Sequence, residues 1–150
     1  MTDEAADQHI ASHAFVLDTL ARGDAGELKK LAETVLPEIG AVEVVTSRTG
    51  LVMLPFVDTV LNTAFHLGEV LVAEAHIRLG DHGDLDGYGA VIGRDLEQAM
   101  AMAVVDGALA AGIQTPKILS FVEDQAARQA EEDTLRLRKV EATRVKMETF

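Results

Sequence analysis

Residues 64–79 read AFHLGEVLVAEAHIRL, and the turn-forming stretch GDHGD follows them directly. Val70, Val72 and Ile77 favour an extended backbone here, because β-branched side chains pack well on a pleated surface. The Asp and Gly residues after Leu79 are typical of a chain reversal. The pattern predicts one long β-strand, with Gly68 as a candidate interruption, followed by a tight turn.

Shorter strand patterns lie on both sides of this segment. Valines predict a strand at residues 42–45, Thr49-Gly50 predicts a turn, and residues 51–57 predict a second strand with Pro55 at an edge or a bulge. After the turn residues Asp86-Gly87, residues 88–92 predict the last strand. Consecutive strands joined by short turns indicate an antiparallel meander of about four strands.

Helical periodicity marks both ends of the chain. Apolar residues at helical spacing predict one helix over residues 3–22 and a second helix after it. Asp24 and Glu27 form a capping box at the start of the second helix, and Pro37 and Gly40 predict its end. We therefore expect one α+β domain, helical over 1–40, a β-meander over 41–93 and helical again over 94–150, whose sheet packs against the N- and C-terminal helices.

The C-terminal helical region divides into two predicted helices. Asp95 and Gln98 predict the start of the first helix, which Gly112 ends. Thr115-Pro116 predicts the start of a long second helix. The alternating residues 145–148 predict a tail strand.

Composition limits the classes of function. The net charge is −12 with a pI near 4.7, so nucleic acids and anionic membranes are poor partners. Cysteine is absent, which excludes thiol catalysis and disulfides. We expect a cytoplasmic protein, because residues 1–8 lack the basic start of a secretory signal and no apolar run reaches the length of a bilayer span.

Two groups of residues could carry chemistry, although each has a simpler interpretation. His9 and His13 are four apart on a predicted helix and could share a metal ion, but solvated helix histidines are the usual case and we expect no metal. Asp81, Asp84 and Asp86 offer carboxylates for acid–base chemistry or, more simply, form an acidic turn.

The stretch Gly93-Arg94-Asp95 is the most informative local feature. An Arg beside a helix N-terminus could bind an anion, since free backbone N–H groups point outward there. The simpler interpretation is a capped helix whose Arg94 pairs with a neighbouring carboxylate, and spacing alone favours it.

Six segments, in order along the chain, resemble one known family. They are TGLVM at residues 49–53, FHLGEV at 65–70, HIRL at 76–79, GYGAVIGRD at 87–95, the helix at 103–109 with Asp106, and TRV at 143–145. Because they are collinear and span about two thirds of the chain, the sequence is identified as a member of the PhnG family of the bacterial carbon–phosphorus lyase pathway.

The resemblance implies a role in the first committed step of phosphonate catabolism. In that step ATP and methylphosphonate exchange adenine for phosphonate at the ribose anomeric carbon, forming alpha-D-ribose 1-methylphosphonate 5-triphosphate. The family works with the PhnH, PhnI, PhnJ and PhnL proteins, and it belongs to a core assembly with two copies each of G, H, I and J. Nucleosidase chemistry is attributed to I and radical chemistry to J.

From this resemblance we expect an accessory, assembly-forming subunit that is inactive alone and binds no cofactor, with ATP as a substrate of the complex. We also expect a homodimer that uses the strand around Val70 and the tail around Val145. The alternative is a ligand-binding or catalytic subunit that contacts ATP directly through Arg94, Arg78 and Arg48.

The candidate site residues follow from the same motifs. Phosphate or interface contacts are expected at Arg48, Arg78, Arg94, Asp95 and Arg144, and the family glycines correspond to Gly50, Gly68 and Gly93. No catalytic residue is assigned. The chain departs from the family pattern at Glu74, Leu96 and Gln98, and each departure removes cationic character, which favours the accessory role.

Overall fold

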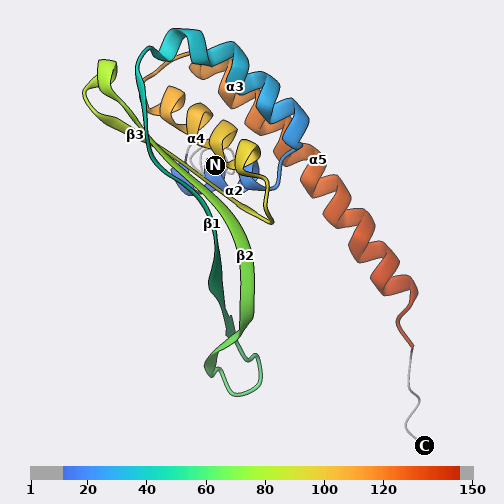
Figure 1. The fold of residues 1–150 in the computed structure, drawn as a ribbon. Coiled ribbons are helices and arrows are strands. Elements are labelled where there is room, and N and C mark those ends of the chain that lie inside the picture. The colour runs from blue at the N-terminus through green and yellow to red at the C-terminus, as the bar shows by residue number, and fades with distance from the viewer. Residues whose placement is uncertain (1–11, 146–150) are drawn as a thin grey trace, which may run out of the picture.

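The structure is a computed structural model that describes residues 12–145. In chain order the elements are α2 (His13–Ala21), α3 (Ala25–Ile39), β1 (Val42–Val57), β2 (Ala64–Leu79), the short 3-10 helix η1 (Gly80–His82), β3 (Leu85–Ile92), α4 (Leu96–Ala110) and α5 (Thr115–Ala142). The α+β class is confirmed: an antiparallel sheet packs against helices from both ends of the chain (Figure 1).

The sheet has three strands in the order β1-β2-β3, not the predicted four. The prediction of a turn at Thr49-Gly50 is wrong, because these two residues pair with Ala73 and Val72 and β1 runs straight through them. Ladder hydrogen bonds to β2 along the whole of β1 outweigh the local turn preference of one Thr-Gly dipeptide.

The long strand is confirmed with the predicted bounds, residues 64–79. Gly68 does not interrupt it, since this glycine pairs with Leu54. The prediction for Pro55 is confirmed: the residue lies at a register shift on β1, which is an edge strand.

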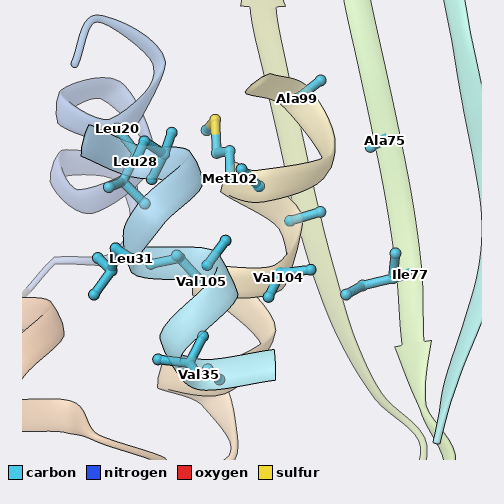
Figure 2. Packing of buried hydrophobic residues seen from close by; sticks show 14 of the residues in the cluster. Leu20, Leu28, Leu31, Val35, Ala75, Ile77, Ala99, Met102, Val104 and Val105 are labelled. Atoms are coloured by element: carbon cyan, nitrogen blue, oxygen red, sulfur yellow. The ribbon is translucent and has the colours of Figure 1, made fainter. Parts of the chain in front are cut away.

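Three layers build the core. Along β2 every second residue from Ala73 to Leu79 is buried, and this face packs against α4. Figure 2 shows α4 lying between β2, with Ala75 and Ile77, and α3. The helix α4 therefore lies in the middle of the core, and residues 101–108 are all buried.

Two glycines of β3 allow α4 to approach closely. A Cβ added at Gly87 would overlap the carbonyl oxygen of Ala103, and one added at Gly89 would overlap that of Ala99. Only a residue without a side chain fits such a contact.

The predicted helix starts are confirmed. The Asp24 carboxylate accepts the Glu27 N–H at 2.8 Å, and the Asp95 carboxylate accepts the Gln98 N–H at 2.8 Å. The helix end predicted at Gly40 is confirmed, since Gly40 is the C-cap with a positive φ of 81°, but Pro37 does not end the helix, because α3 continues through it to Ile39.

The ends of the chain bear on two predictions. Of the helix predicted over 3–22, the described part is α2, capped by Ser12, and residues 3–11 lie outside the described residues. Residues 146–148 of the predicted tail strand lie outside them too, and Val145 is exposed and outside any helix or strand.

The buried residues of the last helix, α5, all lie in its first half, and polar contacts to α2 continue as far as Asp133, which pairs with Arg22. Ile118, Val122 and Gln125 are buried, whereas Leu137 and Val140 further along are exposed. Gln125 fixes the junction, since it accepts the Asp24 N–H and donates to Glu27. The C-terminal end of α5, beyond these contacts, projects from the body, as does the β1–β2 hairpin (Figure 1).

Candidate functional site

The outer face of the sheet carries a network around Glu74. The register of β1 and β2 places Arg48 opposite Glu74, and the Arg48 Nε donates to the Glu74 carboxylate at 2.9 Å. The hydroxyl of Tyr88 on β3 donates to the other carboxylate oxygen at 3.0 Å. These residues line part of a shallow pocket of about 420 Å³ that extends over Gly50 and Val72.

The network shifts the pKa of two of its members. The guanidinium of Arg48, followed by the Tyr88 hydroxyl, lowers the pKa of Glu74. Burial raises the pKa of Tyr88, and its hydrogen bond to the Glu74 carboxylate adds to this. Glu74 therefore stays ionised at neutral pH and neutralises Arg48.

A second set of charges lies further along the same face. Arg78 is 3.5 Å from Asp86 and 3.8 Å from Glu43, and His76 is 3.2 Å from the same Asp86 oxygen. Arg78 is thus already compensated by two carboxylates. It lies four residues along β2 from Glu74, which corresponds to roughly 13 Å at the rise of an extended strand.

The Gly93-Arg94-Asp95 corner lies where β3 passes into α4. The Gln98 N–H, followed by Lys29, lowers the pKa of Asp95, and the Lys29 ammonium lies 3.0 Å from that carboxylate. Gly93 has a φ of 112°, a conformation that requires glycine.

The prediction that this corner is a capped helix start is therefore confirmed, but the prediction that Arg94 pairs with a neighbouring carboxylate is wrong. Within residues 12–145 Arg94 makes no ion pair, and its side chain is exposed, while Lys29 takes the place beside Asp95.

The remaining predicted residues do not join these groups. Arg144 lies just beyond α5 and is 3.3 Å from Glu141. Gly50 and Gly68 lie in the hairpin, where an added Cβ would meet open space, so packing does not demand glycine at either position. The structure brings together Arg48 and Gly50 at one pocket, and it leaves Arg78, Arg94 and Arg144 at separate places.

Asp106 is a polar group that the motif contained but to which the sequence analysis gave no role. Its carboxylate is 4% exposed and accepts the Tyr88 backbone N–H at 2.9 Å and the His13 Nε2–H at 2.7 Å. One buried side chain thus ties α4 to β3 and to α2. The available signal was that Asp106 is the one charged residue in the apolar stretch of residues 99–110.

The metal and acid–base hypotheses are not supported by the described geometry. His9 lies outside the described residues, and His13 is bonded to Asp106. Across residues 12–145 no group of three or more His, Asp or Glu side chains is arranged to hold a metal ion. Asp81 lies in the turn η1 after β2, and its carboxylate accepts the Ala41 N–H at 2.8 Å, which joins this turn to the residue before β1.

These contacts define what the outer face can do chemically. Its two arginines are each matched by carboxylates, so the face presents neutralised ion pairs and hydroxyls, not a convergent cluster of free cations. Such a surface is suited to a protein contact more than to gripping a triphosphate, which needs several converging cationic groups.

Within the described part of the chain, no helix is both long enough and apolar enough to cross a membrane.

Comparison with known proteins supports the family that the six motif segments indicate. A family model described as phosphonate metabolism protein PhnG matches residues 13–150. A protein of Rhizobium meliloti (strain 1021), named alpha-D-ribose 1-methylphosphonate 5-triphosphate synthase subunit PhnG, is 30% identical over 141 residues, covering 93% of this chain and 88% of the relative. The chain belongs to the PhnG family.

Proposed function

We propose that this chain is an accessory, assembly-forming subunit of a synthase that makes alpha-D-ribose 1-methylphosphonate 5-triphosphate from ATP and methylphosphonate. The observation that carries the proposal is the likeness, over nearly the whole length of both chains, to a relative named as a subunit of that synthase. A subunit, by definition, works through contacts with other chains.

The charge arrangement supports an accessory role over direct ATP binding. ATP bound through Arg48 and Arg78 would have to displace Glu74, Glu43 and Asp86, whose charges already compensate these guanidiniums. The chain as a whole is also strongly acidic, with a net charge of −12, which opposes the approach of a triphosphate. A partner subunit would then supply the phosphate grip.

The partners that the proposal names are the PhnH, PhnI, PhnJ and PhnL proteins, in the cytoplasm, with ATP as a substrate of the complex and no cofactor held by this chain. Two copies of the chain would pair through the free edge of β2. This edge is available because β3 pairs with residues 72–79 of β2, which leaves residues 64–70 with backbone groups open on that side. Light scattering of the purified chain tests the dimer, and a monomer at high concentration would contradict it.

An adenine-release assay tests the main proposal. ATP and methylphosphonate are incubated with the pure chain, with the full set of subunits, and with the set from which this chain is omitted. We expect release only from the full set. Release by the chain alone would refute the accessory role, and undiminished release without it would refute membership of the synthase.

A further inference from the structure

We propose that the projecting hairpin of residues 49–70, here called the apolar ribbon, inserts into an apolar cleft of a different subunit of the synthase, which closes over both faces of the ribbon. The inference rests on the proposed function and adds the surface by which the chain enters the assembly.

The apolar ribbon exposes far more apolar surface than a free surface loop needs. Its large apolar side chains are each 41–85% exposed; they are Leu51, Val52, Met53, Leu54, Phe56, Val57, Val60, Leu61, Phe65 and Leu67. Together they present an area on the order of the ~800 Å² that one side of a standard protein interface buries. Soluble monomers rarely expose a contiguous apolar patch of that size.

Charge is nearly absent from the same segment. Between Thr49 and Val70 the Asp, Glu, Lys and Arg residues are Asp58, in the loop, and Glu69, on β2, whereas such residues make up 25% of the chain. Desolvating a charge is costly, so a segment with few charges, here one in the loop and one on β2, is typical of one that becomes buried.

Both faces of the ribbon are apolar. Side chains alternate between faces along a strand, so Leu51 and Met53 lie on the face that continues the buried side of β2, and Val52 and Leu54 lie on the opposite face. Each of these four side chains is at least 41% exposed. Strands that are apolar on both faces are those covered on both faces in the native state.

This two-sided pattern selects the kind of partner. A two-fold contact with a second copy covers one edge or one face and would leave the other face in water. The proposed pairing at the β2 edge satisfies backbone groups and does not cover the faces. A cleft in another polypeptide can cover both faces of the ribbon at once.

The experiment compares retention of the other synthase subunits by a tagged chain co-produced with them. Leu51→Glu and Val52→Glu place a charge on opposite faces of the ribbon. Leu137→Glu is the matched control, because Leu137 is 68% exposed on the projecting part of α5. We expect both ribbon variants to weaken association by at least about tenfold, since each would bury an unpaired charge in the cleft, and the control to stay within about twofold.

Unfolding temperatures of the isolated variants establish that they fold. Should a ribbon variant fail to fold, hydrogen exchange of the wild-type chain replaces it, and we expect the amides of residues 49–70 to become protected in the complex. The inference would be overturned if the wild-type chain retains the other subunits and the ribbon variants retain them equally well. It would also be overturned if the ribbon amides stay unprotected in the complex.

Two further outcomes are distinguishable. If only one of the two ribbon variants weakens association, the contact is flat and covers one face. If a ribbon variant converts a dimer of the isolated chain to a monomer, a second copy covers the ribbon. Either result would overturn insertion into a cleft. Failure of the wild-type chain to retain any subunit would instead refute the proposed function itself.

Discussion

Replacing Asp106 by Ala would remove the one buried carboxylate that joins three elements of the fold. The side chain is 4% exposed, and its two oxygens accept the Tyr88 N–H of β3 and the Nε2–H of His13 in α2. After the substitution the Tyr88 N–H, which faces α4, has no acceptor, and the close packing of Gly87 against Gly107 leaves little space for a replacement water.

The expected cost follows from these contacts. An unsatisfied buried N–H costs about 1–3 kcal/mol. The bond to His13 adds about 0.5 kcal/mol, because the imidazole is 67% exposed and water competes for it. We therefore expect Asp106→Ala to lower the free energy of unfolding by about 1.5–3.5 kcal/mol and the Tm by roughly 3–14 °C for a domain of this size.

Urea and thermal unfolding of three variants measure this loss in the free energy of unfolding. Asp106→Asn keeps an acceptor for the Tyr88 N–H and a donor for a neutral His13, so it should cost less than about 1 kcal/mol. His13→Ala removes only the exposed partner and should also cost less than about 1 kcal/mol. The reasoning is refuted if Asp106→Ala is no more destabilising than His13→Ala.

Three further expectations follow from the same structure. Gly89→Ala should destabilise by about 3 kcal/mol or more in urea unfolding, because its Cβ would strike the backbone of α4, whereas Gly68→Ala, which meets open space, should change stability by less than about 1 kcal/mol. Tyr88 is the only tyrosine, so an ultraviolet titration should show a midpoint above 10.0, and Glu74→Gln should move that midpoint partly back. The raised pKa of Tyr88 contributes stability that is complete below the pKa of the unfolded state and is lost as the pH rises through the pKa of the folded state. Tyr88→Phe should therefore make the free energy of unfolding fall less steeply at alkaline pH. Arg94→Ala should alter the free energy of unfolding by less than about 0.5 kcal/mol, since this exposed side chain makes no ion pair within residues 12–145. A loss of more than about 1 kcal/mol in urea unfolding would contradict this expectation.

Local signals placed most of the secondary structure. The caps at Asp24 and Asp95 mark helix starts because a short acceptor side chain beside free N–H groups acts within one turn. The bounds of β2 followed from β-branched residues and the Asp-Gly turn after it. At Thr49-Gly50 a local turn preference competed with the β1–β2 ladder, and the ladder prevailed. At Pro37 the helix α3 continued for two more residues, up to Ile39.

The candidate site depended on relationships between distant segments. Arg48 and Glu74 are 26 residues apart, and their ion pair exists because the β1–β2 register sets them side by side. Periodicity cannot supply that register, which is decided by pairing over the whole hairpin. For the same reason the sequence could suggest Arg48, Arg78 and Arg94 as one phosphate grip, although the fold gives the first two different carboxylate partners.

By itself the sequence determined the α+β class, the helix caps, the long strand and the family, because these depend on neighbours in the chain or on motifs in a fixed order. The tertiary structure alone decided that Asp106 would tie β3 to α4, that the arginines of the outer face would be neutralised, and that residues 49–70 would project uncovered on both faces. Such properties depend on which surfaces the packing of distant elements buries and which it leaves in water, and a one-dimensional pattern contains that information only indirectly.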